Sequence, residues 1–231
     1  MAKSKVKTAY VCGDCGAEHT KWQGQCNTCT EWNTLSRVSI GPIKERQVGF
    51  AGAKAQVKKL GAVEAEETSR ISTTFSELDR VLGGGMVPGS VILIGGDPGA
   101  GKSTLLLQVC TRLSKTSRVL YVTGEESLQQ LALRAKRLDL PLDYLDVAAE
   151  TRAEVIAGHI EAHKSEVVIL DSVQVMQMEH IDSTPGSVTQ VRETAAFFTR
   201  LAKQTDTVIV LVGHITKEGG LAGPKVLEHM I

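Results

Sequence analysis

The segment with the clearest chemistry is a glycine-rich loop near the middle of the chain. Gly96 to Thr104 follows the pattern G-x4-G-K-[S/T], the Walker A signature of phosphate-binding loops. Its glycines let successive main-chain N–H groups turn toward phosphates at the positive end of the following helix. Lys102 is expected to reach the β- and γ-phosphates, and the Ser103 hydroxyl to bind Mg²⁺. The predicted nucleotide-binding residues are Gly96, Asp97, Pro98, Gly99, Ala100, Gly101, Lys102, Ser103 and Thr104.

An aspartate directly after an apolar run matches a second nucleotide-binding motif. Residues 167–170 are Val-Val-Ile-Leu, and Asp171 follows them as in a Walker B motif. Such a carboxylate is expected to hold Mg²⁺ through water, because hydrolysis needs the metal to offset charge on the transferring phosphoryl group. An aspartate that only caps a helix or closes a turn is the alternative. The Walker A partner earlier in the chain favours the metal-binding role.

Two glutamates and a histidine are candidates for the hydrolytic step. Glu125 and Glu126 follow the apolar run 118–123, and either carboxylate would polarise an attacking water. The residues alone do not choose between them, since one can instead begin the next helix. His214 follows the apolar run 207–212, where it would contact the γ-phosphate or only cap the strand. On these residues alone the capping role is favoured.

Four cysteines near the start of the chain have the spacing of a metal site. They form two C-x2-C pairs separated by ten residues: Cys12, Cys15, Cys26 and Cys29. Two such pairs can converge as four thiolates around a tetrahedral zinc ion, whose binding would supply about 10–16 kcal/mol of folding free energy. Two disulfides, disfavoured in a reducing cytoplasm, and a rubredoxin-like iron site are the alternatives. His19, between the pairs, is expected at the surface, and Cys110 in a helix core.

The elements around these residues alternate between strand and helix. Strands are expected at residues 90–94, 118–123, 167–170 and 207–212, and helices at 102–116, 127–138, 151–164 and 187–205. This order is typical of an α/β fold with a parallel central sheet and a nucleotide at the carboxyl edge of its strands. The loops at 179–187 and 216–225 would lie on that edge, where binding loops are expected. Residues 83–86, Gly-Gly-Gly-Met, are expected to form a turn.

Composition excludes several classes of protein. The 231 residues are 42% hydrophobic and 23% charged, near ordinary globular usage, which argues against wholesale disorder, collagen-like repeats and a disulfide-rich toxin. No uncharged apolar run approaches the roughly 18 residues of a membrane span. Residues 1–10 carry three lysines and no apolar region of a signal peptide. We therefore expect a cytoplasmic protein without membrane contact.

Charge is divided unevenly along the chain. Residues 1–60 carry ten basic and four acidic side chains, a net +6, so residues 61–231 carry −6, because the whole chain has 26 of each sign. A basic N-terminal region suits a polyanionic partner, although a solvated linker has the same composition. In residues 37–70, glycines interrupt any hydrophobic period, and lysine is frequent between them. This composition predicts a linker at 37–70, between a four-cysteine module at 1–36 and a core domain at 71–231.

Taken together, these motifs resemble the bacterial RadA (Sms) family of RecA-like DNA repair ATPases. The order of cysteine pairs, basic linker, Walker A, Glu-Glu, Walker B and Gly-His matches the family across essentially all 231 residues. Shorter stretches match as well: Tyr10–Cys12, Lys21–Cys26, Trp32–Thr34, Gly95–Gly99, Pro185–Val188, Gln190–Glu193, Val212–Gly219 and Ala222–Met230. The resemblance implies a RecA-like P-loop NTPase preceded by a zinc-ribbon module.

The resemblance also implies an activity. Family members hydrolyse ATP under DNA stimulation and move on single-stranded DNA, as in branch migration of recombination intermediates, with ATP between subunits of a homo-hexameric ring. ATP, Mg²⁺ and Zn²⁺ are the implied cofactors, and the RecA recombinase is an implied partner. By this plan Glu125 is the water-activating base and His214 the γ-phosphate sensor. The two loops would face DNA in the ring's channel, with Lys217 and Lys225 at its phosphates.

The chain departs from the family pattern in two places. The family continues beyond the position of Ile231 with a Lys-Asn-Arg-Phe-Gly motif and a Lon-protease-like domain, so we expect this chain to be an N-terminal portion. Thr30 stands where the second cysteine pair commonly has glycine. The leading hypothesis is a DNA-dependent ATPase of repair and homologous recombination. A zinc-dependent DNA- or partner-binding fragment that holds ATP without turnover is the alternative, and a regulatory RecA-like ATPase acting on proteins is a third.

Overall fold

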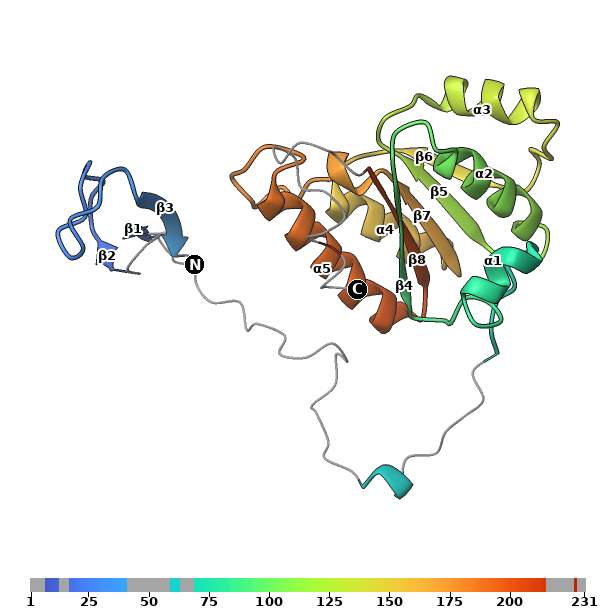
Figure 1. The fold of residues 1–231 in the computed structure, drawn as a ribbon, viewed down its shortest axis with the longest axis horizontal. Coiled ribbons are helices and arrows are strands. Elements are labelled where there is room, and N and C mark those ends of the chain that lie inside the picture. The colour runs from blue at the N-terminus through green and yellow to red at the C-terminus, as the bar shows by residue number, and fades with distance from the viewer. Residues whose placement is uncertain (1–6, 13–16, 41–58, 63–68, 215–226, 228–231) are drawn as a thin grey trace, which may run out of the picture. The chain divides into compact units, whose positions relative to one another are not determined.

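The computed structural model describes residues 7–12, 17–40, 59–62, 69–214 and 227 (Figure 1). Its chain divides into two compact units, Met1–Val48 and Gly49–Ile231. Within the described ranges no helix is long and apolar enough to cross a membrane.

The smaller unit contains a three-stranded antiparallel sheet in the order β2-β1-β3. Its strands are β1 (Lys7–Cys12), β2 (Glu18–His19) and β3 (Leu35–Ile40). Tyr10 lies opposite His19, and Cys12 lies opposite Leu35. Cys26 and Leu35 are buried at the centre of a small cluster, which is too little apolar surface to stabilise a unit of this size alone.

The larger unit is built on a five-stranded sheet in the order β4-β8-β7-β5-β6, with every neighbouring pair parallel. The strands are β4 (Val91–Gly96), β5 (Val119–Thr123), β6 (Asp146–Ala149), β7 (Val167–Asp171) and β8 (Val208–His214). The predicted α/β class with a parallel central sheet is confirmed. Strand β6, which lacks a continuous apolar run, was not predicted, and it forms one edge of the sheet.

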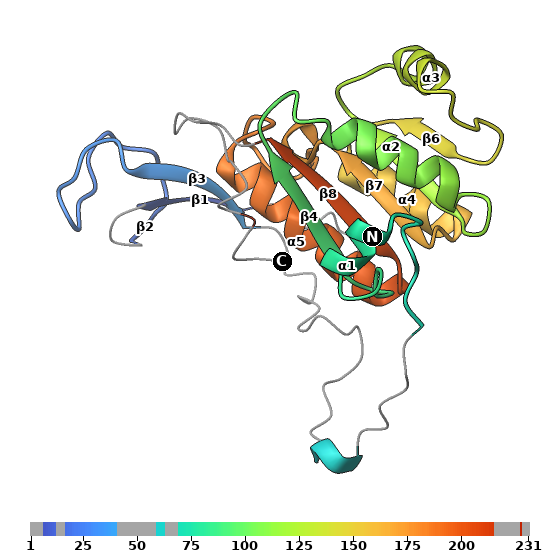
Figure 2. The same cartoon turned by 45° about the vertical axis from the view of Figure 1, so that its right-hand side comes forward.

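Helices cover both faces of this sheet (Figure 2). Helices α2 (Lys102–Leu113) and α3 (Leu128–Arg137) pack on one face. Helices α4 (Ala153–His163) and α5 (Val188–Thr205) pack on the other. Alternate strand residues point to opposite faces, so that Tyr121 joins the α2–α3 side and Val122 the α4–α5 side. Burial on both faces explains why the central strands β5 and β7 are continuous apolar runs.

Local side chains determine where several helices begin. Ser127 caps α3 in a capping box with Gln130, and the Ser187 hydroxyl accepts from the main-chain N–H of Gln190 at 3.3 Å at the start of α5. Helix α4 begins two residues later than predicted, because the carboxylate of Glu150 accepts the N–H groups of Thr151 and Arg152. The remaining short helices are α1 (Ser76–Val81) and two 3-10 turns, η1 (Leu60–Ala62) and η2 (Val173–Val175).

The predicted glycine turn at residues 83–86 follows α1. Gly85 has φ of 127°, and a Cβ there would lie 2.8 Å from the carbonyl oxygen of Ile71. The close approach allows Ile71 and Met86 to exchange two main-chain hydrogen bonds of 2.8 Å. Any larger residue at this position would separate the two segments. Cys110 is completely buried, as predicted, and burial raises the pKa of its thiol.

Candidate active site

The glycine-rich loop joins β4 to α2 and encloses the amino group of Lys102. Gly99 and Gly101 have φ of 80° and 85°, and a Cβ at either would meet nothing within 4 Å. Glycine therefore suits these positions because of backbone conformation and not because of crowding. Lys102 is 8% exposed, and its Nζ donates to the carbonyl oxygens of Gly96 at 2.8 Å and Asp97 at 2.9 Å. The ammonium group is thus held within the loop.

The rest of the loop is accessible. Asp97, Pro98, Gly99 and Ala100 are exposed, and Ser103 and Thr104 are half-buried in the first turn of α2. The main-chain N–H groups of that turn have no acceptor within the helix. Together with the positive end of the helix dipole, they suit an anionic ligand.

The strand order brings the other predicted site residues to the same edge of the sheet. β8 lies between β4 and β7, with His214 opposite Gly96 and Val212 opposite Asp171. β5 follows on the other side of β7, with Thr123 opposite Asp171. The carboxyl ends of these four strands therefore form one continuous edge.

Glu125 and His214 are in contact at this edge. One oxygen of Glu125, Oε1, lies 3.3 Å from His214 Nε2 and also accepts a hydrogen bond from the Ser172 hydroxyl. The amide of Gln174 donates to the main-chain oxygen of His214 at 3.2 Å, which fixes the end of β8. His214 Nδ1 is buried and has no hydrogen-bond partner within the described part of the chain. A buried nitrogen of this kind costs free energy until water or a ligand bonds it.

The neighbouring glutamate has a different environment. Glu126 forms an ion pair with Arg134 of α3. Its main-chain N–H and carbonyl both bond the Thr123 hydroxyl, at 3.0 Å each. The structure therefore separates two glutamates that the sequence could not distinguish: Glu125 faces His214, and Glu126 faces α3.

Asp171 is a buried carboxylate with a buried partner. It is 8% exposed, and its Oδ2 accepts a hydrogen bond of 2.5 Å from the hydroxyl of Tyr121, whose side chain has no exposed surface. Burial, with the negative charge of Asp171 as a smaller cause, raises the pKa of Tyr121 well above its usual range. The phenol therefore remains protonated and donates to the carboxylate.

Three residues of this site were missed in the sequence: Tyr121, Ser172 and Gln174. Ser172 could have been suspected, since it directly follows Asp171. Tyr121 had a weaker signal, as the one hydroxyl-bearing aromatic in an otherwise aliphatic strand interior. Gln174 had none, because its contact depends on how η2 passes the end of β8.

An acidic cavity lies beside this site, between the carboxyl ends of β5 and β6. Its volume is about 280 Å³, and it is lined by Thr123, Gly124, Glu125, Glu126, Ala149, Glu150 and Thr151. Its carboxylates are engaged: Glu150 accepts from Arg152 Nε at 3.1 Å and from Nη2 at 2.8 Å, besides two main-chain N–H groups. These bonds, with the Arg152 side chain as the largest cause, lower the pKa of Glu150 to about 2.

The lowered pKa of Glu150 predicts a pH-dependent contribution to stability. The pKa of about 2 in the folded chain lies below the ordinary glutamate pKa of 4.5, so the contribution is complete above pH 4.5 and is lost as the pH falls toward 2. Since Arg152 is 47% exposed, we expect only about 1 kcal/mol. Denaturant unfolding of Glu150→Gln should accordingly show a smaller loss of stability between pH 5 and pH 3 than the native chain.

The matched control is Glu179→Gln. Glu179 approaches the same Arg152 at 3.9 Å but is 64% exposed. The Glu179→Gln variant should therefore show the same dependence of stability on pH as the native chain. Equal profiles for Glu150→Gln and the native chain would contradict the prediction.

Gln190 organises the first of the two predicted binding loops. Its side chain, 2% exposed, accepts from the N–H of Met178 at 3.0 Å and donates to the carbonyls of Ile181 and Ser183, both at 3.1 Å. One buried amide thus holds much of the loop at 179–187. The second loop, 216–225 with Lys217 and Lys225, lies outside the described residues.

The second cysteine pair lies in the core of the smaller unit. Cys26 is buried and Cys29 is half-buried; the main chain of Cys12 is part of β1, and Cys15 lies outside the described residues. His19 was expected at the surface, but it is half-buried, and its Nε2 lies 3.5 Å from Cys26 Sγ. Strand pairing with β1 turns it inward. Thr30 has φ of 63°, a conformation in which glycine is favoured, which fits the glycine that the family resemblance implies at this position.

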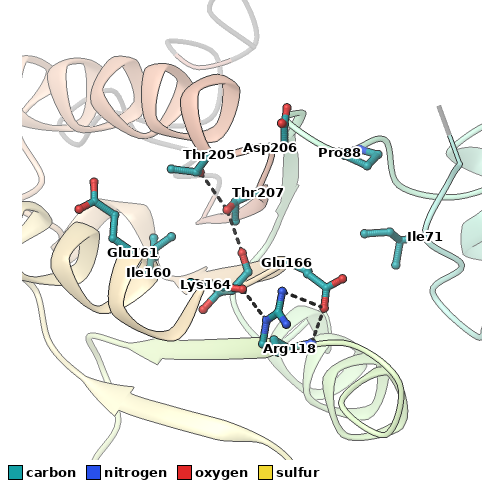
Figure 3. A pocket seen from close by; sticks show the side chains of 11 residues that line it. Ile71, Pro88, Arg118, Ile160, Glu161, Lys164, Glu166, Thr205, Asp206 and Thr207 are labelled. Atoms are coloured by element: carbon teal, nitrogen blue, oxygen red, sulfur yellow. Dashed lines mark hydrogen bonds and ion pairs between the residues drawn. The ribbon is translucent and has the colours of Figure 1, made fainter. Parts of the chain in front are cut away.

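A larger cavity of about 520 Å³ lies at the opposite edge of the sheet, where the strands begin (Figure 3). Arg118 lines it and donates from Nε to the carbonyl of Lys164 at 2.7 Å, and the hydroxyl of Thr207 donates to the carbonyl of Ser165 at 2.8 Å. No predicted site residue lines it. The chemistry is therefore concentrated at the carboxyl edge.

Two family models match the chain. One, described as an AAA domain, matches residues 57–220. This range includes the phosphate loop, Glu125, Asp171 and His214. The chain belongs to the AAA domain family. The second model, described as a rubredoxin metal binding domain, matches residues 10–37 and so includes all four clustered cysteines. The AAA domain thus carries the phosphate loop, and a separate metal-binding domain precedes it.

Curated relatives of this AAA domain chain extend the comparison. It is 56% identical to the DNA repair protein RadA of Haemophilus influenzae, 55% to that of Escherichia coli and 46% to that of Listeria monocytogenes. Each match covers 100% of this chain and 51%, 52% and 51% of the respective relative. The resemblance to bacterial RadA is confirmed, and the chain spans about half the length of these relatives.

Proposed function

We propose that the AAA domain of this chain binds ATP with Mg²⁺ and hydrolyses it in DNA repair. The observation that carries the proposal is the convergence at one sheet edge. The phosphate loop that ends β4 lies next to His214, which contacts Glu125, and the buried Asp171 ends the following strand. A phosphate cradle, a metal-binding carboxylate and a base are the parts that phosphoryl transfer to water requires.

The residues present fit both ATP and Mg²⁺. Lys102 holds an ammonium group inside the loop, and a hydroxyl and a carboxylate, Ser103 and Asp171, are the oxygen ligands that Mg²⁺ prefers. Bound Mg²⁺ supplies positive charge that offsets the charge developing on the transferring phosphoryl group. Glu125 accepts a proton from the attacking water. His214, which joins Glu125 to the strand beside the loop, contacts the γ-phosphoryl group.

The proposed substrate and partners rest on the relatives, which are DNA repair proteins. We infer that this chain acts on single-stranded DNA and branched recombination intermediates. The processes would be homologous recombination and the response to DNA damage stress. The net +6 of residues 1–60 supports contact with a phosphate backbone. A homo-hexamer, cooperation with the RecA recombinase and a cytoplasmic location complete the proposal.

The smaller unit is proposed as a zinc ribbon. Cys12, Cys15, Cys26 and Cys29 would bind the ion, and the match to a metal-binding domain at residues 10–37 supports this assignment. A closed set of four thiolates has no open position for catalysis, so the role of the metal is structural. The module was expected at residues 1–36, but β3 carries its sheet to Ile40, so the linker that was expected at 37–70 would begin after Ile40 and lead to the core domain at 71–231.

The test is ATP hydrolysis by the purified chain with Mg²⁺, with and without single-stranded DNA. Lys102→Ala provides the background and Lys115→Ala, an exposed lysine just beyond α2, the matched control. We expect the native chain and Lys115→Ala to exceed Lys102→Ala and to be stimulated by DNA. Nucleotide binding without turnover would contradict the proposal and favour a zinc-dependent DNA- or partner-binding role.

A further inference from the structure

We propose that Tyr121 is a positioning residue for the metal site: its buried hydroxyl orients Asp171 toward Mg²⁺. This inference rests on the proposed function. Nothing in the Walker motifs includes Tyr121, which lies in the interior of β5, two residues before its end. The observation is the 2.5 Å hydrogen bond from its hydroxyl to Asp171 Oδ2.

The register of β5 and β7 explains how the Tyr121 hydroxyl reaches Asp171, the candidate metal ligand. β5 and β7 are neighbours, with Tyr121 opposite Ile169 and Thr123 opposite Asp171, so the phenol reaches diagonally along the sheet to the last residue of β7. The ring belongs to the α2–α3 face of the core, in one cluster with Leu106 and Cys110 of α2. α2 is the helix that begins with Lys102 and Ser103. Tyr121 therefore links the strand that carries Asp171 to the helix that carries the phosphate loop.

The chemistry of the pair is asymmetric. A buried carboxylate needs hydrogen-bond donors, and Oδ2 of Asp171 has one in the fully buried hydroxyl of Tyr121. The bond fixes the rotation of the carboxylate group, so that Oδ1 is the oxygen left to face a cation or its bound water. Groups that hold metal ligands in this way typically change metal affinity by about 10–100-fold when removed.

The phenol does not act alone in this part of the core. Arg134 of α3 lies in the same region, where it forms an ion pair with Glu126. Since Arg134 already has a carboxylate partner, it does not replace the hydrogen bond that the phenol supplies.

The experiment compares nucleotide binding by the native chain and Tyr121→Phe, which retains the ring. Mg²⁺ is titrated at a fixed concentration of a fluorescent, non-hydrolysable ATP analogue, and the analogue is titrated separately in EDTA. We expect Tyr121→Phe to require about 10-fold more Mg²⁺ for half-maximal binding, with unchanged affinity in EDTA. Tyr144→Phe, which alters a tyrosine that is 61% exposed, is the matched control and should behave as native. An unchanged Mg²⁺ midpoint, or equal weakening with and without Mg²⁺, would overturn the inference.

A second measurement needs no change at Tyr121. The chain has three tyrosines, so ¹³C-tyrosine NMR of Tyr10→Phe and Tyr144→Phe assigns Tyr121 by elimination. Adding Mg²⁺ to nucleotide-bound protein should shift the Tyr121 ring signal, and an unshifted signal would overturn the inference. If the native chain binds the analogue without any Mg²⁺ dependence, the proposed function fails, whereas a Mg²⁺-dependent native chain with an indifferent Tyr121 refutes only its positioning role.

Discussion

Replacing Glu125 with glutamine is expected to lower kcat for ATP hydrolysis by a factor of about 10²–10⁴, because the site loses its general base. Nucleotide binding should persist, since the side-chain partners of Glu125 among the described residues are Ser172 and His214, and glutamine keeps the size of the side chain. The Ser172 hydroxyl can still donate to the amide oxygen of the variant. Steady-state turnover and equilibrium binding of a fluorescent ATP analogue would measure the two effects separately.

The adjacent glutamate offers a matched control. Glu126→Gln removes a charge that pairs with Arg134 at a partly exposed position, so kcat should change by less than about threefold. Equal losses in the two variants would show that charge at this edge, and not the position of one carboxylate, supports hydrolysis. A Glu125→Gln variant with native turnover would contradict its role as the base.

Loss of zinc is expected to unfold the smaller unit. Among its described residues the buried apolar cluster centres on Cys26 and Leu35 alone, whereas a structural zinc ion contributes about 10–16 kcal/mol of apparent binding free energy. Cys26→Ser should therefore reduce bound zinc from about one ion per chain to nearly none. It should also abolish the amide dispersion of this unit in NMR spectra. Elemental analysis of purified protein measures the zinc content directly.

Two other variants sharpen the zinc prediction. Cys110→Ala alters a cysteine in the core of the other unit and should retain the native zinc content. His19→Ala removes a ring nitrogen 3.5 Å from Cys26 Sγ, and it should retain one zinc with affinity lowered by about 10–100-fold. Native zinc in Cys26→Ser would contradict the four-thiolate site, and complete loss in His19→Ala would indicate that histidine is itself a ligand.

Much of the secondary structure of the larger unit could be predicted, because apolar runs and helix limits depend on residues that are close together in the sequence. The apolar runs that became β5, β7 and β8 are buried on both faces, and the helices between them begin and end near their predicted limits. Strand β6 escaped prediction because it is short and mostly exposed, so its sequence shows no apolar periodicity. The small antiparallel sheet escaped because its stability depends on few buried side chains.

The sequence by itself determined the chemistry that depends on neighbouring residues. The phosphate loop is specified by glycines whose positive φ values permit its curvature and by the lysine that follows them. Asp171 was recognisable from the apolar run before it. The spacing of Cys12, Cys15, Cys26 and Cys29 likewise indicates a metal site without knowledge of the fold.

Only the tertiary structure decided which distant side chains meet. Placing β8 between β4 and β7 brings His214 to the loop and to Glu125, and the β5–β7 register brings the Tyr121 hydroxyl to Asp171. Strand order and register follow from burial summed over the whole core, so no short stretch of sequence encodes them. For the same reason Glu125 and Glu126, identical and adjacent in the sequence, have different environments in the folded chain.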